Sequence, residues 1–280
     1  MERTVLVTGS SSGIGRATVE AFLDDGWTAY ATARDPDDVA GLGERDGCSV
    51  AALDVTDGDD VERVVGRMID EQGRIDCLVN NAGYGQFGPV EDLPVGTVRR
   101  QYEVNVYGPH RLTRAVLPHM REAGDGTVVN VSSVAGRVAF PGGGAYCGSK
   151  FALEAMSDAL RAEVGDHGID VVLIEPGPVD TGFRERAARE VEGDGEAPGL
   201  DRSGAYGSFY EAFGAARSVG DGGPGTVGPE RVAAAVVDAA AATRPRARYP
   251  VGALARVAVL GRFVPDAWRD RAFDLLSRLT

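Results

Sequence analysis

Lysine is almost absent from this sequence. Of the 29 basic side chains among 280 residues only Lys150 is a lysine, and 42 acidic side chains give a net charge of -13. Nucleic-acid affinity comes mainly from clustered basic residues that displace counterions, so this balance argues against a DNA or RNA partner. A high carboxylate content is typical of proteins from a salt-rich cytoplasm, and a bias toward arginine codons is an equally good explanation.

Cysteine, histidine and long apolar runs are also scarce. The three cysteines show no CxxC spacing, so we expect reduced thiols and neither a disulfide framework nor a zinc site. The three histidines, at positions 110, 119 and 167, lack the spacing of a metal site. No run approaches the roughly 20 apolar residues of a membrane span, and no signal peptide is recognisable. We expect a cytoplasmic protein without a bound metal or a membrane span.

The hydrophobic fraction of 43% and the charged fraction of 25% are those of a globular protein. Short apolar runs alternate with longer amphipathic stretches, a pattern typical of parallel strands joined by crossover helices. This pattern predicts an α/β fold with a doubly wound, Rossmann-like parallel sheet flanked by helices, in one domain over residues 1–280. The predicted strands are residues 4–8, 28–32, 49–54, 77–80, 127–131 and 170–175.

The composition changes after residue 184. Residues 184–229 are rich in Gly, Glu, Asp, Arg and Ser, which predicts a flexible surface insertion that covers the site as a lid. Tyr206, Phe209, Tyr210 and Phe213 within it share one face of a predicted helix, as expected for core packing, a lid over an apolar substrate, or an oligomer contact. Residues 230–280 are predicted as a C-terminal extension with a helix over 230–243, an edge strand over 244–252 and a packing helix over 265–279.

A glycine-rich turn follows the first predicted strand, where the run from Thr8 to Gly15 reads TGSSSGIG. Glycines allow the backbone to approach a phosphate closely, and the helix that follows supplies N–H donors and a positive dipole end. The position between a strand and a helix therefore predicts a dinucleotide site. Its spacing is GxxxGxG, whereas the commonest dinucleotide fingerprint is GxGxxG. The predicted cofactor contacts in this turn are Gly9, Ser11, Ser12, Gly13, Ile14 and Gly15.

The segment from residue 130 to 150 reads NVSSVAGRVAFPGGGAYCGSK and carries the predicted chemistry. Tyr146 and Lys150 are four positions apart, so they share one face of a helix. A phenol with a pKa near 10 is a poor base at neutral pH, and a nearby ammonium lowers that pKa. We therefore predict that Tyr146 is a general acid/base, that Lys150 supplies the charge and a hydrogen bond to the cofactor, and that Ser133 holds the substrate oxygen.

These two segments resemble the short-chain dehydrogenase/reductase family, and their details are similar to its branch of 17β-hydroxysteroid and retinol dehydrogenases. The resemblance implies that Asn105 completes the catalytic set with Ser133, Tyr146 and Lys150 by holding a water molecule of a proton relay. It further implies contacts to adenosine and to nicotinamide. The residues assigned to these contacts are Asp54, Val55, Asn81, Ala82 and Gly83 for adenosine, and Pro176, Gly177, Val179 and Thr181 for nicotinamide.

The residues after the second predicted strand bear on the choice of cofactor. Arg34 offers a planar guanidinium that can bind the 2′-phosphate of NADP with two hydrogen bonds. Asp35 follows it directly, and a carboxylate at this place can instead bind the ribose of NAD. We therefore favour NADP(H), with NAD(H) as the alternative.

Together these features predict an NADP(H)-dependent oxidoreductase that interconverts a secondary alcohol and a ketone or aldehyde, with an apolar small-molecule substrate. The resemblance implies a homo-oligomer, either a dimer or a tetramer. One alternative is an NADP-binding regulator without turnover, and another is an NAD-preferring dehydrogenase of the same family. A sugar-nucleotide epimerase or dehydratase would show a TGxxGxxG loop and a larger C-terminal domain, and this sequence has neither.

Overall fold

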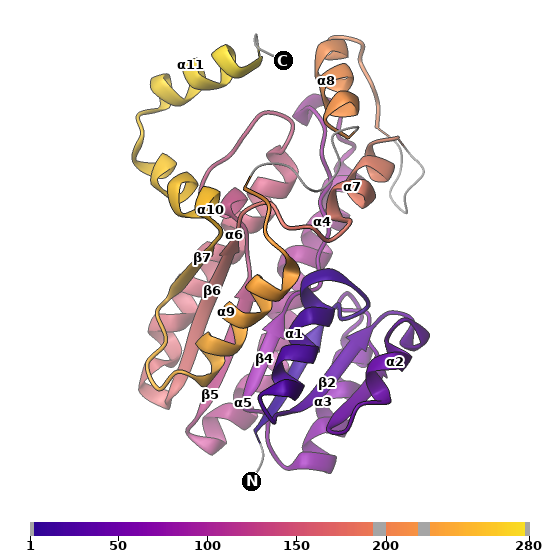
Figure 1. The fold of residues 1–280 in the computed structure, drawn as a ribbon, viewed down its shortest axis with the longest axis vertical. Helices are drawn as coiled ribbons and strands as arrows, with labels where there is room; N and C mark the ends of the chain where they lie inside the picture. The colour runs from indigo at the N-terminus through magenta and orange to yellow at the C-terminus, as the bar shows by residue number, and fades with distance from the viewer. Residues whose placement is uncertain (1–2, 193–199, 218–224, 278–280) are drawn as a thin grey trace.

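The computed structural model describes residues 3–192, 200–217 and 225–277 (Figure 1). A seven-stranded sheet with the order β3-β2-β1-β4-β5-β6-β7 forms its centre, and every strand pair is parallel. The direction of strand succession reverses between β1 and β4, which is where doubly wound folds bind their ligands. The strands are β1 Thr4–Thr8, β2 Thr28–Ala33, β3 Cys48–Ala52, β4 Cys77–Asn80, β5 Gly126–Val131, β6 Ile169–Pro176 and β7 Arg248–Val251.

Helices cover both faces of the sheet, so the central strands are apolar on both sides. In β1, Val5 and Val7 belong to the core beneath α1 (Gly13–Asp24) and α9 (Pro229–Ala241). Leu6 points to the other face, where it joins the core beneath α3 (Gly58–Gln72) and α5 (Gly108–Ala123). The alternation of side chains along a strand thus builds two cores around one sheet.

The remaining elements connect these layers or follow them. Among the described residues, none of the helices has the length and apolar character that crossing a bilayer requires. The shorter elements are η1 Pro36–Val39, α2 Ala40–Gly43, η2 Val90–Asp92, α4 Val95–Tyr102, the π-helix η3 Glu103–Tyr107, η4 Val134–Gly136 and η5 Gly165–His167. The longer or later ones are α6 Gly144–Val164, α7 Phe183–Glu192, α8 Gly207–Arg217, α10 Ala253–Ala258, η6 Val259–Phe263 and α11 Asp266–Ser277.

The predicted doubly wound sheet is confirmed, with strand ends displaced by one or two residues. The third strand was expected over 49–54 but ends at Ala52, because the chain turns at Asp54. The Asp54 carboxylate accepts hydrogen bonds from the Thr56 backbone N–H (2.8 Å) and hydroxyl (2.7 Å). The backbone N–H of Asp54 donates to the Asp60 carboxylate instead of to a neighbouring strand.

The C-terminal third differs more from the expectation. The edge strand predicted over 244–252 is shortened to β7, because residues before Arg248 form a turn in which the Arg246 N–H donates to the Tyr249 hydroxyl (3.2 Å). The segment 184–229 contains the two helices α7 and α8, and residues 193–199 and 218–224 lie outside the described residues. The helix predicted over 265–279 is α11, and residues 278–280 also lie outside. The helical elements α10 and η6 were not anticipated.

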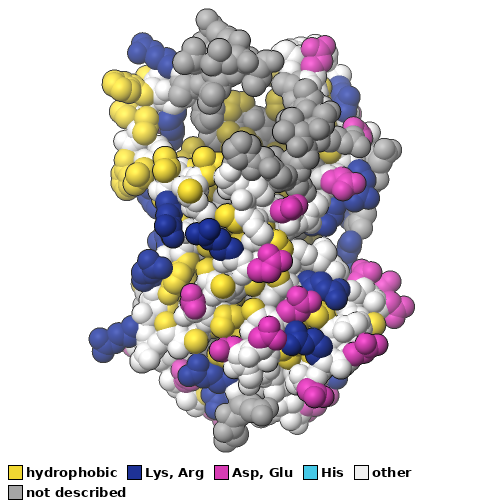
Figure 2. Space-filling view, in the orientation of Figure 1, with side chains coloured by type: hydrophobic (Ala, Val, Ile, Leu, Met, Phe, Trp, Pro, Cys, Tyr) yellow, Lys and Arg dark blue, Asp and Glu magenta, His cyan; other side chains and the backbone are white. Residues whose placement is uncertain are grey.

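Charges and apolar side chains are distributed unevenly over the surface. Figure 2 shows arginine and acidic side chains interspersed over the lower body of the molecule. Hydrophobic side chains gather at the upper left, over α10 and the segment that follows it (Figures 1 and 2). In the same view α7 and α8 lie beyond the carboxyl ends of the strands, where a C-terminal lid is expected.

Candidate active site

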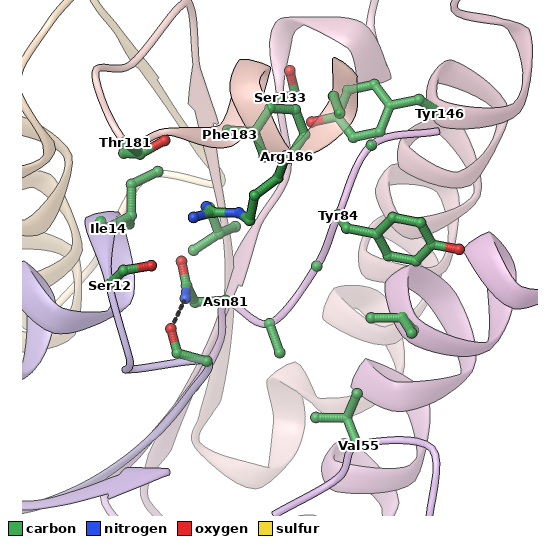
Figure 3. Close-up of a pocket in the computed structure, with 18 of the residues that line it drawn as sticks. Ser12, Ile14, Val55, Asn81, Tyr84, Ser133, Tyr146, Thr181, Phe183 and Arg186 are labelled. Atoms are coloured by element: carbon green, nitrogen blue, oxygen red, sulfur yellow. Dashed lines mark hydrogen bonds between the residues drawn. The ribbon is translucent and has the colours of Figure 1, made fainter. Parts of the chain in front are cut away.

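A cleft of about 1750 Å³ opens at the carboxyl ends of β1, β4, β5 and β6 (Figure 3). It lies at the switch point of the sheet, as expected for this architecture. All the residues predicted to bind cofactor or to act in catalysis line it, except Gly15 and Asn105. These two are buried directly behind the lining. The structure thus brings segments from six separate parts of the chain to one cavity.

The glycine-rich turn requires glycine for steric reasons. Gly9 has a φ of 69°, in the left-handed region that favours glycine. A Cβ added at Gly15 would lie 2.1 Å from the carbonyl oxygen of Gly9, so no other side chain fits there. The turn leads into α1, whose first residue is Gly13, so the N–H groups of a helix N-terminus face the cleft. A turn of this shape fits a pyrophosphate.

Hydrogen bonds fasten this turn to the segment after β4. The Thr8 hydroxyl oxygen accepts from the backbone N–H groups of Asn81 and Ala82, each at 3.0 Å. In return the Asn81 side-chain amide donates to the carbonyl oxygens of Thr8 (2.9 Å) and Gly9 (3.0 Å), and one of these bonds is visible in Figure 3. Asn81 therefore positions the two sides of the switch point relative to one another.

The end of the cleft that is predicted to bind adenosine contains Arg34, Asp35, Asp54 and Val55. Arg34 directly follows β2. The Asp35 carboxylate accepts a hydrogen bond from the Asp37 backbone N–H (3.0 Å) and caps η1. Val55 packs against the N-terminus of α5, since a Cβ added at Gly108 would lie 2.8 Å from its side chain. The side chains of Arg34 and Val55 therefore line the same end of the cleft as the carboxylates of Asp35 and Asp54.

Tyr146 and Lys150 lie one turn apart on α6, and both are buried. The Lys150 Nζ donates a hydrogen bond to the backbone carbonyl oxygen of Val131 (2.8 Å), the last residue of β5. Ser133 follows β5 and caps η4, where its hydroxyl accepts from the Ala135 N–H (3.1 Å). A strand end and a helix thus present hydroxyl, phenol and amine to the same cavity.

Burial shifts the pKa of both titratable groups. Removal from water raises the pKa of Tyr146 to about 12, and a hydrogen bond with Ser133 opposes that shift. Removal from water lowers the pKa of Lys150 to about 8, and the negative charge of Glu154 opposes that shift. Burial disfavours the charged form in each case. At neutral pH, Tyr146 therefore carries its proton, and Lys150 keeps its charge but loses it slightly above neutrality.

Asn105 occupies the π-helix η3 between α4 and α5, and a π-turn of this kind is frequent at functional sites. Its side-chain amide donates to the Tyr84 carbonyl oxygen (2.9 Å) and to the Ser149 hydroxyl (3.1 Å), while its oxygen accepts from the Tyr84 N–H (3.1 Å). The Ser149 hydroxyl in turn donates to the carbonyl oxygen of Tyr146 (2.7 Å). Asn105 thus links α6 to the segment after β4.

The loop after β6 is held from two sides. The Gly177 N–H donates to the carbonyl oxygen of Val251 in β7 (3.1 Å), and Val179 forms a parallel bridge with Val227. Thr181 packs on the glycine-rich turn, because a Cβ added at Gly13 would lie 2.9 Å from the Thr181 Cβ. The loop predicted to bind nicotinamide therefore lies directly beside the turn predicted to bind phosphate.

The matches to known proteins agree with this arrangement. Residues 3–192 match the family model described as short chain dehydrogenase. This chain belongs to the short-chain dehydrogenase family. It is an oxidoreductase with a Rossmann-like fold, as its relatives are.

Three similar proteins span nearly the whole chain. The uncharacterized oxidoreductase YbbO of Escherichia coli K12 is 36% identical over 277 residues, which cover 97% of this chain and 94% of that protein. The NADPH-dependent 3-dehydrocapnine reductase of Ornithobacterium rhinotracheale is 32% identical over 280 residues, with 97% and 96% covered. A crystal structure of a short-chain dehydrogenase from Streptomyces avermitilis has 36% identity and a TM-score of 0.80, with 100% and 98% covered.

This short-chain dehydrogenase has an aromatic wall above Tyr146 that sequence reasoning found only in part. Its five members are Phe87, Phe140, Phe183, Phe209 and Phe213. The Phe87 ring lies 5.4 Å from the Tyr146 ring, and the Phe183 ring lies 5.6 Å from it. Phe213 belongs to α8, and the centre of its ring lies 6.1 Å from the centre of the Phe87 ring. The cavity is therefore apolar next to the phenol.

The aromatic stripe predicted over residues 206–213 divides into two parts. Phe209 and Phe213 stack at 5.8 Å and belong to the aromatic wall. Tyr206 lies just before α8, and its hydroxyl donates to the Glu91 carboxylate, while the Tyr210 hydroxyl donates to Asp92, each at 2.7 Å. One part of the stripe thus lines the site, and the other fastens α8 to the segment around η2.

Arg186 is a second residue that the sequence patterns did not indicate. It lies on α7 and lines the cleft. Figure 3 shows its guanidinium pointing into the cleft beside Asn81, toward Ser12 and Ile14. A positive charge from the lid region therefore faces the glycine-rich turn.

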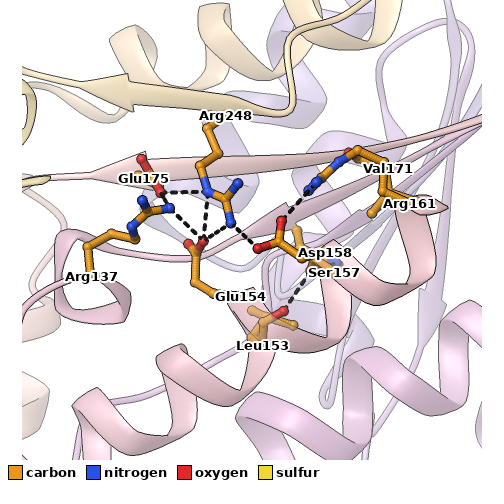
Figure 4. A network of polar contacts seen from close by, with 10 residues as sticks. Arg137, Leu153, Glu154, Ser157, Asp158, Arg161, Val171, Glu175 and Arg248 are labelled. Carbon is orange, nitrogen blue, oxygen red and sulfur yellow. Dashed lines mark hydrogen bonds and ion pairs between the residues drawn. The ribbon is translucent and has the colours of Figure 1, made fainter. Parts of the chain in front are cut away.

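A partly buried ion network supports α6 on the side of β6 and β7 (Figure 4). Arg137 lies 3.1 Å from the Glu175 carboxylate at the end of β6 and 3.5 Å from Glu154 on α6. Arg248 of β7 approaches the same two carboxylates, Glu154 at 3.1 Å and Glu175 at 3.3 Å. Burial raises the pKa of Glu175, and the charge of Glu154 adds to the effect. The network connects α6, β6, β7 and the turn after Ser133.

Proposed function

We propose that this chain transfers hydride between NADP(H) and a secondary alcohol or the corresponding ketone or aldehyde, with Tyr146 as the general acid/base. The observation that carries the proposal is the placement of Tyr146, Lys150 and Ser133 in one cavity with the glycine-rich turn and Arg34. A regulator without turnover would have no use for a buried phenol and amine one turn apart.

The cofactor, when bound, donates or accepts the hydride, and the chain's own residues handle the proton. In reduction the Tyr146 phenol gives its proton to the carbonyl oxygen of the substrate, while the Ser133 hydroxyl holds the same oxygen and stabilises its developing charge. The pKa of about 12 keeps this phenol protonated at neutral pH. In oxidation the Lys150 ammonium favours the phenolate that accepts the substrate proton.

Several observations support NADP(H) over NAD(H). Arg34 follows β2 and lines the cleft, and a guanidinium can bind a 2′-phosphate with two hydrogen bonds. The Asp35 carboxylate caps η1 through the Asp37 backbone N–H, which already uses part of its capacity to accept hydrogen bonds. The similar reductase of Ornithobacterium rhinotracheale is named as NADPH-dependent. Arg186, which points toward the glycine-rich turn, adds a positive charge for the pyrophosphate.

The aromatic wall supports an apolar substrate. Phe87 and Phe183 contact the Tyr146 ring directly, so the carbon chain or ring attached to the reacting carbonyl would lie against aromatic faces. Asn105 acts as a positioning residue, because it holds the Tyr146 turn of α6 through Ser149. We further propose that α7 and α8 form the lid that covers this pocket.

The proposal is tested by NADPH oxidation with a panel of apolar ketones and aldehydes, including steroids, retinoids and long-chain ketones. At least one should be reduced, and Tyr146→Phe should lower kcat by about 10²- to 10⁴-fold, the range of general acid catalysis. NADP affinity should stay unchanged in that variant. Tyr107→Phe, at a tyrosine exposed on η3, serves as the matched control and should retain full activity. If wild type and Tyr146→Phe bind NADP equally and neither turns over any substrate, the regulator alternative is supported.

A further inference from the structure

Six large apolar side chains are exposed together near the end of the described chain. The Phe263 side chain is 76% exposed and that of Trp268 is 69% exposed. We call this set the C-terminal patch, and it lies on α10, η6, the residue after η6 and α11. Its members are Leu254, Val257, Leu260, Phe263, Val264 and Trp268. Contiguous apolar surface of this kind marks an interaction site.

The patch is locally basic although the protein as a whole is acidic. Residues 253–265, which carry five of the six patch side chains, contain two arginines and no acidic residue, whereas residues 1–243 have a net charge of -18. Arg256, Arg262 and Arg271 are exposed, and none of them pairs with a carboxylate among the residues the structure describes. The Arg262 guanidinium lies 5.5 Å from the centre of the Phe263 ring. Cations and aromatic rings therefore face solvent side by side.

We propose that the C-terminal patch docks on the surface of a lipid bilayer that contains anionic lipids. Its apolar side chains would enter the boundary between head groups and acyl chains, where tryptophan is favoured, and its arginines would pair with lipid phosphates. The opposite charges of the two parts of the chain orient the molecule, because an anionic surface attracts the basic end and repels the acidic body.

Charge also argues against a second copy of the chain on the patch. In a two-fold symmetric dimer the same patch contacts itself, so two surfaces with a net positive charge would face each other. Like charges placed across an interface are unfavourable. An anionic bilayer satisfies both the apolar and the basic character of the patch.

Docking would place the aromatic wall near the bilayer. A Cβ added at Gly261 would lie 3.0 Å from the Val138 side chain, so η6 packs against the loop that continues to Phe140. A Cβ at Gly177 would lie 3.5 Å from the backbone nitrogen of Ala255, which places α10 beside the loop after β6. The α10 and η6 part of the patch thus packs beside the loops that lead to the aromatic wall and follow β6, so an apolar compound dissolved in lipid would be close to the cleft.

The test is co-sedimentation of the full chain with vesicles of phosphatidylcholine alone and of phosphatidylcholine mixed with phosphatidylglycerol, without substrate or cofactor. The wild type should bind the mixed vesicles and bind the neutral ones much more weakly, and salt should weaken the binding because it screens surface charge. Arg256→Gln combined with Arg262→Gln should lower the affinity by about fivefold per arginine. Phe263→Ser combined with Trp268→Ser should abolish detectable binding.

Matched controls come from other faces of the molecule. Val95→Ser removes an equally exposed apolar side chain, and Arg114→Gln removes an exposed arginine of α5. Both should bind vesicles as the wild type does, and all variants should keep the wild-type melting temperature and NADP affinity. The proposal is overturned if the wild type does not bind mixed vesicles, or if patch and control variants bind equally. It is also overturned if Phe263→Ser with Trp268→Ser turns an oligomer into a monomer while vesicle binding is absent, since the patch would then join copies of the chain. Loss of reductase activity has no bearing on these outcomes.

Discussion

The Lys150 ammonium donates a hydrogen bond of 2.8 Å to the backbone carbonyl oxygen of Val131 and by this bond joins α6 to the end of β5. Lys150 is the sole lysine of the chain, whose other basic residues are all arginines, and its side chain is buried. A compact ammonium fits beside a strand end, whereas a planar guanidinium is larger and keeps its charge firmly. The small size of the ammonium therefore suits this position, and the burial of its charge costs stability.

Replacement of Lys150 by methionine should stabilise the cofactor-free protein. The pKa of Lys150 falls from 10.5 in the unfolded chain to about 8 in the folded protein, so below pH 8 both states hold the proton and the folded state bears the full burial cost. After subtraction of the lost hydrogen bond, Lys150→Met should raise the free energy of unfolding by about 2 kcal/mol at pH 7.

The pH dependence of that difference provides the check. As pH rises from 8 to 10 the folded wild type releases the lysine proton before the unfolded chain does, so the wild type gains stability and the difference shrinks. Urea unfolding of both proteins at several pH values measures it. A difference that stays constant from pH 7 to pH 10 would contradict the burial argument.

Arg34→Asp should change the preference between cofactors. Loss of a two-bond contact to phosphate should raise the Michaelis constant for NADP by about 10- to 100-fold, because hydrogen bonds between charged groups are the strong ones. The constant for NAD should change little or fall. Steady-state kinetics with both cofactors measures this, and Arg45→Asp, at an exposed arginine paired with Asp24, serves as the control. An equal change of both Michaelis constants would contradict a contact between Arg34 and the 2′-phosphate.

Arg137→Met should destabilise the fold by about 3 kcal/mol, because it leaves the Glu154 and Glu175 carboxylates buried with fewer partners. Addition of Glu175→Gln to that variant should restore part of the loss, since one unpaired charge is then removed. Chemical denaturation of the two variants and of Glu175→Gln alone gives the coupling energy. Purely additive effects would show that Arg137 and Glu175 do not stabilise one another.

Gly142→Ala should weaken binding of the substrate without affecting the cofactor. A Cβ at Gly142 would lie 2.0 Å from the Phe209 ring. Phe209, and α8 with it, would therefore have to move away from the rest of the aromatic wall. The Michaelis constant for an apolar ketone should rise by about tenfold, as expected when overpacking costs one to two kcal/mol. Gly73→Ala is the matched control, because Gly73 has nearly the same φ, 73° against 74°, and nothing within 4 Å of an added Cβ. If the control has the same effect, backbone strain rather than the contact with Phe209 is responsible.

Sequence patterns located the parts of the site that lie directly after strands. The carboxyl ends of parallel strands meet at one edge of the sheet, so the residues after β1, β4, β5 and β6 had to converge. The same alternation of apolar runs and amphipathic stretches predicted β1 to β6 to within one or two residues at each end, but it gave no strand order and overextended β7. The aromatic residues that surround Tyr146 could not all be predicted from the sequence in this way. Phe87 and Phe140 come from irregular loops, and no periodicity relates them to Phe183 or to α8.

Two further features depend on geometry that residue types do not reveal. The structure places Asn105 in a π-helix, whose extra residue per turn leaves no mark on the apolar pattern of the sequence. Arg186 lies in a charged stretch of the sequence, and the position of α7 brings it to the cleft together with Arg189 and Glu190, which residue types alone do not reveal.

The single lysine also makes the protein chemically simple to probe. Amine-directed acylating reagents meet only one side-chain target in the whole chain, and that target is at the floor of the cleft rather than on the surface. With a pKa of about 8, a substantial fraction of Lys150 is the reactive free amine in mildly alkaline solution. The rate at which this one residue becomes acylated therefore reports access to the cleft, and any molecule that fills the cleft should be detectable by the protection it gives.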